Sequence, residues 1–237
     1  HSLALVAELD TTPPVIAPTI SGTLNNGWYT SAVQLSWNVS DEESAIASTS
    51  GCGPQSVTTD TSGISFTCSA TSAGGSASQS ATIQRDATAP SVSYTGNAGT
   101  YTIDQSVSIA CTATDNLSGI ASSSCANISG PAYTFALGTN TRTASATDNA
   151  GNTGSGSTTF TVGVTFDSLC RLSASFSTSS SVDKGLCDKL AAAKAAAAGN
   201  TKTKNNNLNA YRQQLSAQSG KALTKSPMGR SCIRAMP

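Results

Sequence analysis

The chain has 237 residues, a formal net charge of zero and only 11% charged residues. This length suits two or three small domains, and no run approaches the roughly 20 apolar residues of a membrane-spanning helix. The zero net charge hides an asymmetry, because residues 1–163 hold ten acids and two bases whereas residues 164–237 hold three acids and eleven bases.

Residues 1–9 end in an apolar stretch that precedes the first repeated feature of the chain. Leu3–Leu9 runs directly into Asp10, just as Ala81–Arg85 runs into Asp86. Since Ala81–Arg85 is expected to be the last strand of a module, Leu3–Leu9 is expected to be the last strand of a preceding module or a strand donated to a neighbouring molecule. The chain is therefore expected to be a piece of a larger secreted protein.

A short segment marked by Asp and Pro occurs twice, at Asp10–Pro14 and at Asp86–Pro90, 76 residues apart. Proline fixes its own backbone and extends the residue before it, so each copy is expected to be a stiff, extended joint. A fixed period of this size indicates tandem modules. We call these segments the first joint and the second joint, residues 10–85 the first module and residues 86–163 the second module.

Alternating apolar and polar residues predict strands in the first module. The apolar positions are Val33, Leu35, Trp37 and Val39, then Ile64, Phe66, Cys68 and Ala70. Such alternation is typical of half-buried strands, and the intervening Gly, Ser, Asn and Thr clusters are typical of turns. Several short strands in about 75 residues favour an antiparallel β-sandwich.

The second module repeats this pattern. A shift of 74 residues places Val107, Ile109 and Cys111 at the strand that contains Trp37. The loop from Ser40 to Ile46 then aligns with the loop Thr114–Ile120. Both modules are therefore expected to have one architecture.

Seven cysteines lack the C-x-x-C spacing of metal sites: Cys52, Cys68, Cys111, Cys125, Cys170, Cys187 and Cys232. Close pairs separated by 16, 14 and 17 residues predict the disulfides Cys52–Cys68, Cys111–Cys125 and Cys170–Cys187. Cys232 is then free or bonded to another chain. Three disulfides indicate an oxidising compartment, and hence a secreted or cell-surface protein.

Three motifs resemble those of bacterial immunoglobulin-like repeats: the Asp-x-x-x-Pro joint, the loop Thr114–Ile120 and the loop Thr147–Asn152. They are similar to the hyalin-repeat and Big-type modules of secreted multidomain proteins. The resemblance covers residues 10–163 and implies two tandem immunoglobulin-like β-sandwiches. The first module has Thr71–Gly75 where the second has its Asp-Asn-Ala-Gly-Asn loop, so any role of Asp148 is not shared by both modules.

Residues 164–237 lack the joint and change in composition. Apolar residues recur there at spacings of three and four, which predicts three or four short helices in a small bundle, the last opened by Pro227: Phe166, Leu169, Leu172, Phe176, Leu186, Leu190, Leu208, Tyr211 and Leu215. The stretch from Leu186 to Lys221 resembles the FIMAH-type helical module at the C-terminus of secreted bacterial proteins. That resemblance implies an accessory or surface-associated role.

Catalysis is not expected. The single histidine is His1, so a Ser-His-Asp or Cys-His site has no internal base. Glu42 and Glu43 are neighbours on a loop and are expected to point to different sides, which does not suit a pair of glycosidase carboxylates.

Four aspartates are candidate calcium ligands. Asp10 and Asp86 occupy equivalent joints, and Asp41 and Asp115 occupy equivalent loops. Carboxylate oxygens suit a hard cation, whereas ordinary turn chemistry is the alternative role of Asp at such positions. No other cofactor is expected.

The predicted function is that of a non-catalytic spacer or adhesion segment of a larger extracellular protein. One alternative is a polysaccharide- or wall-binding accessory region of a secreted hydrolase, with Trp28, Tyr29 and Tyr101 as the candidate binding patch. Another is a filament subunit that self-associates through Leu3–Leu9. An extracellular polymer or protein is the expected partner, and the basic residues 164–237 could meet an anionic surface. Nucleic acid is not expected, because the basic segment lacks an aromatic platform.

Overall fold

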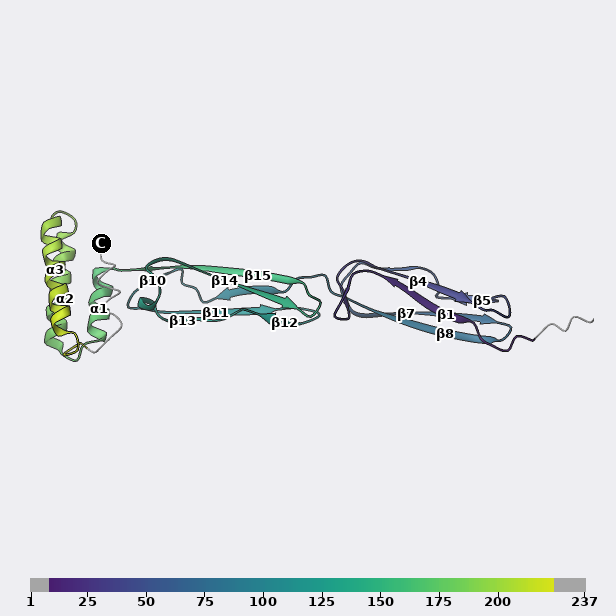
Figure 1. Ribbon diagram of the computed structural model, residues 1–237. Helices are drawn as coiled ribbons and strands as arrows, with labels where there is room; N and C mark the ends of the chain where they lie inside the picture. The colour runs from purple at the N-terminus through teal and green to yellow at the C-terminus, as the bar shows by residue number, and fades with distance from the viewer. Residues whose placement is uncertain (1–8, 224–237) are drawn as a thin grey trace, which may run out of the picture. The chain divides into compact units, whose positions relative to one another are not determined.

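The computed structural model describes residues 9–223. The fold is mainly β, with three helices at its C-terminal side (Figure 1), which confirms the predicted fold class. The residues form two compact units. One comprises the described residues up to Val92 with Ala113–Cys125 and Ser145–Ser155, and the other comprises Ser93–Thr112, Ala126–Ala144 and the described residues from Gly156 onward. The domain boundaries drawn from the sequence, at residues 9, 85 and 163, stay a prediction.

Two sheets make up the first module, with strand orders β1-β4-β6 and β2-β3-β8-β7-β5. The strands are β1 (Val15–Ser21), β2 (Leu24–Asn25), β3 (Trp28–Tyr29), β4 (Val33–Ser40), β5 (Ser48–Ser50), β6 (Gln55–Val57), β7 (Thr61–Ser72) and β8 (Gly75–Arg85). The long hairpin β7–β8 is antiparallel, whereas β3 joins β8 in parallel at Tyr29 and Arg85. This places the hairpin β2–β3 and the start of the second joint at one end of the sandwich.

The alternation seen in the sequence builds the core of the first module. Val33 and Leu35 on β4 are buried, and Gln34 between them is exposed. They pack with Val57 and Ile83 from the neighbouring elements into one cluster, which Trp37 borders. Side chains of alternating residues point to opposite faces of a strand, which is why this pattern produces a sandwich.

The second module also has two sheets, with strand orders β10-β15-β14-β12 and β13-β11-β9. Its elements are β9 (Ser91–Thr95), β10 (Thr100–Thr102), β11 (Ser106–Thr114), β12 (Ile120–Ser123), β13 (Ile128–Pro131), the 3₁₀ helix η1 (Ala132–Thr134), β14 (Gly138–Asp148) and β15 (Thr153–Gly163). Two of the three sequence motifs described above lie in this module, one in the loop between β11 and β12 and the other in the turn between β14 and β15.

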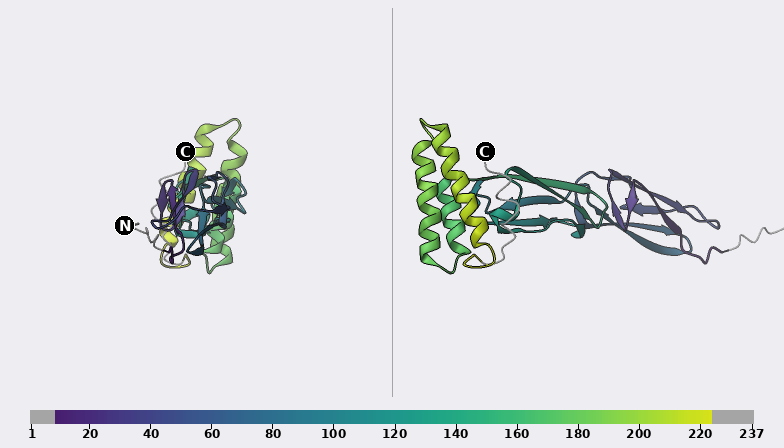
Figure 2. Two further views of the ribbon diagram at one scale, coloured as in Figure 1. Left: turned by 90° about the vertical axis from the view of Figure 1, so that its right-hand side faces the viewer. Right: turned by 60° about the vertical axis from the view of Figure 1, so that its left-hand side comes forward.

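Between the second module and residue 223, the structure has three helices: α1 (Phe166–Ser175), α2 (Ser180–Ala196) and α3 (Thr201–Gln218). Helix α2 contacts both α1 and α3, and the three lie side by side (Figure 2). Thr165 caps α1, because its side chain accepts a hydrogen bond from the backbone N–H of Ser168. None of the helices described between residues 9 and 223 combines the length and apolar character needed to cross a membrane.

Strand and helix residues share one core in the second unit. Phe160 from β15 belongs to the same buried cluster as Leu186 from α2 and Tyr211 from α3. Tyr211 is fully buried, and its hydroxyl lies 2.6 Å from the hydroxyl of Ser173, so its polar end is satisfied inside the core.

Disulfides join the cysteines that are close in sequence. Cys52 is bonded to Cys68 with a Cα–Cα distance of 4.5 Å, and Cys170 on α1 is bonded to Cys187 on α2 with a Cα–Cα distance of 5.0 Å. Cys111 and Cys125 are also disulfide-bonded. Three expectations lie outside the described residues: the state of Cys232, the helix opened by Pro227, and the strand Leu3–Leu9 except for Leu9, which is exposed.

Candidate functional site

Three carboxylates meet where the second joint enters the second module. Asp86 begins the joint, Asp115 lies in the loop after β11, and Asp148 ends β14. Ligand oxygens of the three lie within 4.8 Å of one another, and no other group of three or more metal-ligating side chains this close occurs in the described part of the chain. We call these residues the aspartate cluster. Asp86 is 0% exposed and Asp148 is 1% exposed, so two of the three carboxylates are buried.

The loop after β11 is shaped by Asp115. Its Oδ2 accepts hydrogen bonds from the backbone N–H of Leu117 at 3.0 Å and of Gly119 at 2.8 Å. Gly119 has a φ of 81°, which a residue without a side chain adopts readily. The folded loop then presents the N–H of Ser118 to Oδ2 of Asp86 at 3.0 Å. A short Asp-x-x-x-Gly turn therefore brings two of the carboxylates together.

Asn152 ties the third carboxylate to the joint. Its backbone N–H donates to Oδ1 of Asp148 at 2.8 Å, and its side-chain Nδ2 donates to Oδ2 of Asp148 at 2.9 Å. The same Nδ2 lies 3.0 Å from the carbonyl oxygen of Asp86 and 3.4 Å from that of Thr88. One side chain of the β14–β15 turn thus fixes both Asp148 and the backbone of the second joint.

The aspartate cluster has a chemistry that suits a hard cation. Its hydrogen-bond donors are backbone N–H groups and the amide of Asn152, and none of them carries a positive charge. Like charges that are buried this close together repel each other, and a bound cation would offset that repulsion. Two members of the cluster, Asp86 and Asp115, line a surface pocket of about 430 Å³ together with Asp60 and Thr88 among others. Carboxylate oxygens in a turn-rich pocket are the ligands that calcium prefers.

The equivalent position in the first module has two carboxylates and a hydroxyl. Asp10 and Asp41 correspond to Asp86 and Asp115, and Ser72 stands where the second module has Asp148. Oδ2 of Asp10 accepts hydrogen bonds from the Ser44 hydroxyl at 2.5 Å and from the Gly74 N–H at 2.7 Å.

The pKa values of both aspartates in the first module are lowered. For Asp10 the Ser44 hydroxyl is the largest cause, and partial burial opposes it. For Asp41 the hydroxyl of Ser72 is the largest cause, followed by the N–H of Glu43. Hydroxyl and amide donors therefore stabilise the charges of Asp10 and Asp41.

The four predicted calcium ligands thus fall into two separate pairs. The structure adds Asp148 to one pair, a residue that was not among the candidates. The Asp-Asn-Ala-Gly-Asn turn was its sequence signal, but a comparison of the two modules hid it because Ser72 occupies the equivalent position.

The prediction of one aromatic patch is wrong for Tyr101. This residue is only 6% exposed, and its ring packs edge-to-face against Phe160 with 5.8 Å between ring centroids. Tyr101 lies on the short strand β10 and belongs to the buried core rather than to the surface. Trp28 and Tyr29 are half-buried neighbours on β3.

No family model matches the chain, and no curated protein matches it. Among solved structures it is similar to the fibronectin(III)-like modules of Clostridium thermocellum CbhA, at 11% identity over 62% of this chain and 95% of that chain, with a TM-score of 0.28. It is also similar to domains EC3–6 of protocadherin gammaB7, at 18% identity over 65% of this chain and 52% of that chain, with a TM-score of 0.28. A third similar structure is that of extracellular cadherin domains 3–6 of protocadherin gamma B2, at 16% identity over 67% of this chain and 51% of that chain, with a TM-score of 0.27. The chain spans about half the length of these two protocadherin structures.

Proposed function

We propose that the chain is a non-catalytic segment of a larger extracellular protein, in which ordered joints hold successive β-modules in place. One observation carries this proposal: the second joint is hydrogen-bonded along its backbone and is not a free linker. Its first residue, Asp86, is completely buried, and Asn152 binds the carbonyl oxygens of Asp86 and Thr88. A spacer or adhesion segment needs such joints, because loosely tethered modules do not keep a defined separation.

Disulfides support the extracellular part of the proposal. Cys52–Cys68 and Cys170–Cys187 are formed, and such bonds persist in oxidising compartments. The hyalin-repeat or Big-type character of the modules and the FIMAH-type character of the helices belong to the same proposal. Both rest on the sequence motifs quoted above.

The aspartate cluster is proposed to bind a divalent cation, with calcium as the ion that fits its oxygen ligands. A cation there would compensate the two buried charges and connect the joint with both loops of the second module. Asp148 is the ligand that distinguishes this site from its counterpart in the first module. Replacing it by serine reproduces the residue at position 72, so Asp148→Ser is the matched variant.

NMR relaxation of backbone amides tests both parts of the proposal in one experiment. The rotational correlation time of each module is measured with calcium and with EDTA, in the wild type and in Asp148→Ser. With calcium the wild-type modules are expected to tumble with one common correlation time. With EDTA the second joint is expected to loosen, so the two values separate, and Asp148→Ser is expected not to respond to calcium.

Two failures of this experiment can be told apart. Independent tumbling of the modules in calcium and in EDTA would contradict the role as a spacer. A common correlation time that calcium does not change would contradict the cation site and leave the spacer in place.

A further inference from the structure

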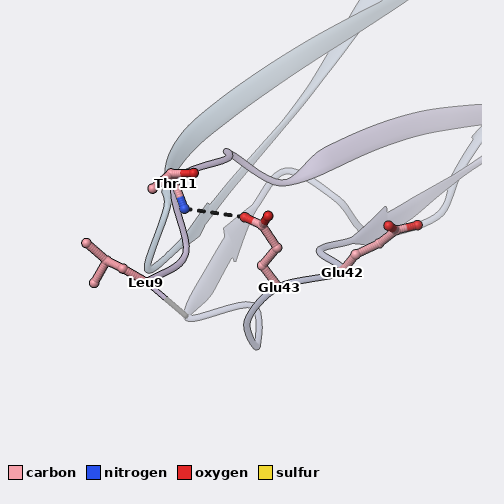
Figure 3. Close-up of a pocket in the computed structure, with 4 residues that line it drawn as sticks. All are labelled: Leu9, Thr11, Glu42 and Glu43. Atoms are coloured by element: carbon pink, nitrogen blue, oxygen red, sulfur yellow. Dashed lines mark hydrogen bonds between the residues drawn. The ribbon is translucent and has the colours of Figure 1, made fainter. Parts of the chain in front are cut away.

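In both joints a carboxylate accepts hydrogen bonds from a backbone N–H and from a threonine hydroxyl, but a different part of the chain supplies the carboxylate in each joint. In the first joint, Oε2 of Glu43 accepts hydrogen bonds from the backbone N–H of Thr11 at 3.3 Å and from the hydroxyl of Thr12 at 3.0 Å. Figure 3 shows Glu43 reaching Thr11 from the loop beside the joint, while its neighbour Glu42 points elsewhere. Glu43 belongs to the module that the first joint precedes.

In the second joint, Asp60 makes the corresponding contacts. Its Oδ1 accepts a hydrogen bond from the backbone N–H of Ala87 at 3.0 Å, and its Oδ2 accepts one from the hydroxyl of Thr88 at 2.5 Å. Asp60 lies between β6 and β7, in the module that precedes the second joint. Arg85 at the end of β8 forms an ion pair with the same carboxylate.

The donors in the two joints are equivalent. Thr11 and Thr12 correspond to Ala87 and Thr88 by the 76-residue period. Both joints also begin with the same turn, because the N–H of Thr12 donates to Asp10 at 3.1 Å and the N–H of Thr88 donates to Asp86 at 3.1 Å. Each joint therefore offers one backbone N–H and one hydroxyl in the same order to a carboxylate.

The position of Glu43 explains why the source of the carboxylate changes. Leu117 stands at the equivalent position of the second module, where its N–H donates to Asp115 at 3.0 Å as the N–H of Glu43 donates to Asp41 at 2.9 Å. The backbone is alike, but leucine cannot accept a hydrogen bond. The second module therefore has no carboxylate at the position from which Glu43 binds the first joint.

We infer that Glu43 and Asp60 have the same role, which is to fix a joint by accepting hydrogen bonds from its backbone N–H and its threonine hydroxyl; we call such a carboxylate a clamp. Glu43 acts within one module, and Asp60 acts between modules. Glu43 fixes the first joint on the first module, whatever precedes that joint. Asp60 fixes the second joint from the preceding module and so couples the first module to the chain that enters the second. This inference does not depend on the proposed cation.

Hydrogen exchange of single amides, measured by NMR in the presence of EDTA, tests the inference. In Asp60→Ala the amide of Ala87 is expected to exchange about tenfold faster, because it loses a hydrogen bond to a charged acceptor, and the amide of Thr11 is expected not to change. In Glu43→Leu the amide of Thr11 is expected to exchange faster, and that of Ala87 is expected not to change. Unchanged exchange at Val33 and Ile83 reports that the core of the first module is intact.

A rescue variant separates a clamp from a general loss of structure. Leu117→Glu, introduced together with Asp60→Ala, supplies the carboxylate from within the second module and is expected to restore slow exchange at Ala87. Leu117→Gln in the same background is the uncharged control and is expected to restore less. If exchange at Ala87 is unaffected by Asp60→Ala, or is not restored by Leu117→Glu, the inference is overturned.

Discussion

Asn152 is one of the side chains that hold the second joint in place. Its amide group reaches two backbone carbonyl oxygens of the joint and one carboxylate oxygen of Asp148. Replacing Asn152 by alanine leaves these acceptors without their donor, so we expect a loss of about 1–3 kcal/mol in the free energy of unfolding. Urea unfolding followed by circular dichroism measures the loss.

Asn116 offers the matched control for this substitution. It lines the same pocket as Asp86 and Asp115 but is exposed. Asn116→Ala is expected to change the free energy of unfolding by less than about 0.5 kcal/mol, as is usual for exposed positions. Equal effects of the two substitutions would mean that Asn152 does not hold the joint.

Two of the three carboxylates of the aspartate cluster were predicted from the sequence. Asp86 and Asp115 were recognisable because each has a counterpart one period earlier, at Asp10 and Asp41. Asp148 was not, because recognition by repetition fails where one copy has diverged to serine. Its contribution depends on a β14–β15 turn that folds back onto the joint, and such long-range proximity does not show in local sequence patterns.

Among the strands, β15 contains three glycines, and two of them, Gly154 and Gly163, have different surroundings. A Cβ atom added at Gly154 would meet the carbonyl oxygen of Pro90 at the end of the second joint, whereas a Cβ added at Gly163 would meet no atom within 4 Å. We expect Gly154→Ala to lower the free energy of unfolding by about 1–3 kcal/mol, because the joint must move away. Gly163→Ala is expected to be neutral or to stabilise by up to about 1 kcal/mol.

Thermal unfolding of the two alanine variants compares them directly. Since both residues lie on one strand and undergo the same substitution, the difference isolates the close approach of the joint to β15. A Gly154→Ala variant as stable as Gly163→Ala would show that the joint is not packed against the strand.

Period-two alternation predicted β4 and β7 but not the short strand β5. Val33 and Leu35 on β4 and Cys68 and Ala70 on β7 are buried, whereas Ile64 on β7 is exposed. The strand β5, with the sequence Ser48–Ser50, has no apolar residue, and it exists because it pairs with β7. Such edge strands are formed by hydrogen bonding to a neighbour that is distant in sequence, so local composition does not reveal them.

For the whole molecule, repetition was the strongest guide to architecture. It predicted two sandwiches and a change to helices after residue 163, and the strands and helices follow that order. It did not predict that helix residues such as Leu186 and Tyr211 share a core with strand residues such as Phe160. A repeated sequence pattern predicts the length and fold of each module. It does not predict which apolar faces of different elements pack together in one core.

Acid is expected to weaken both compact units. The pKa of Asp104 is lowered, since burial, which raises it, is outweighed by hydrogen bonds from Arg171 and the Thr102 hydroxyl; those of Asp10 and Asp41 are lowered as well. A carboxylate whose pKa is lower in the folded state than in the unfolded state stabilises the fold fully at pH values above the unfolded-state pKa, here 3.8. It loses that contribution as the pH falls through the folded-state pKa.

Melting temperatures measured from about pH 7 down to about pH 2.5 should therefore decline mainly below about pH 4. Asp104→Asn should flatten that decline for the unit containing the helices, and an unaltered decline in this variant would show that the Asp104–Arg171 pair does not contribute to it.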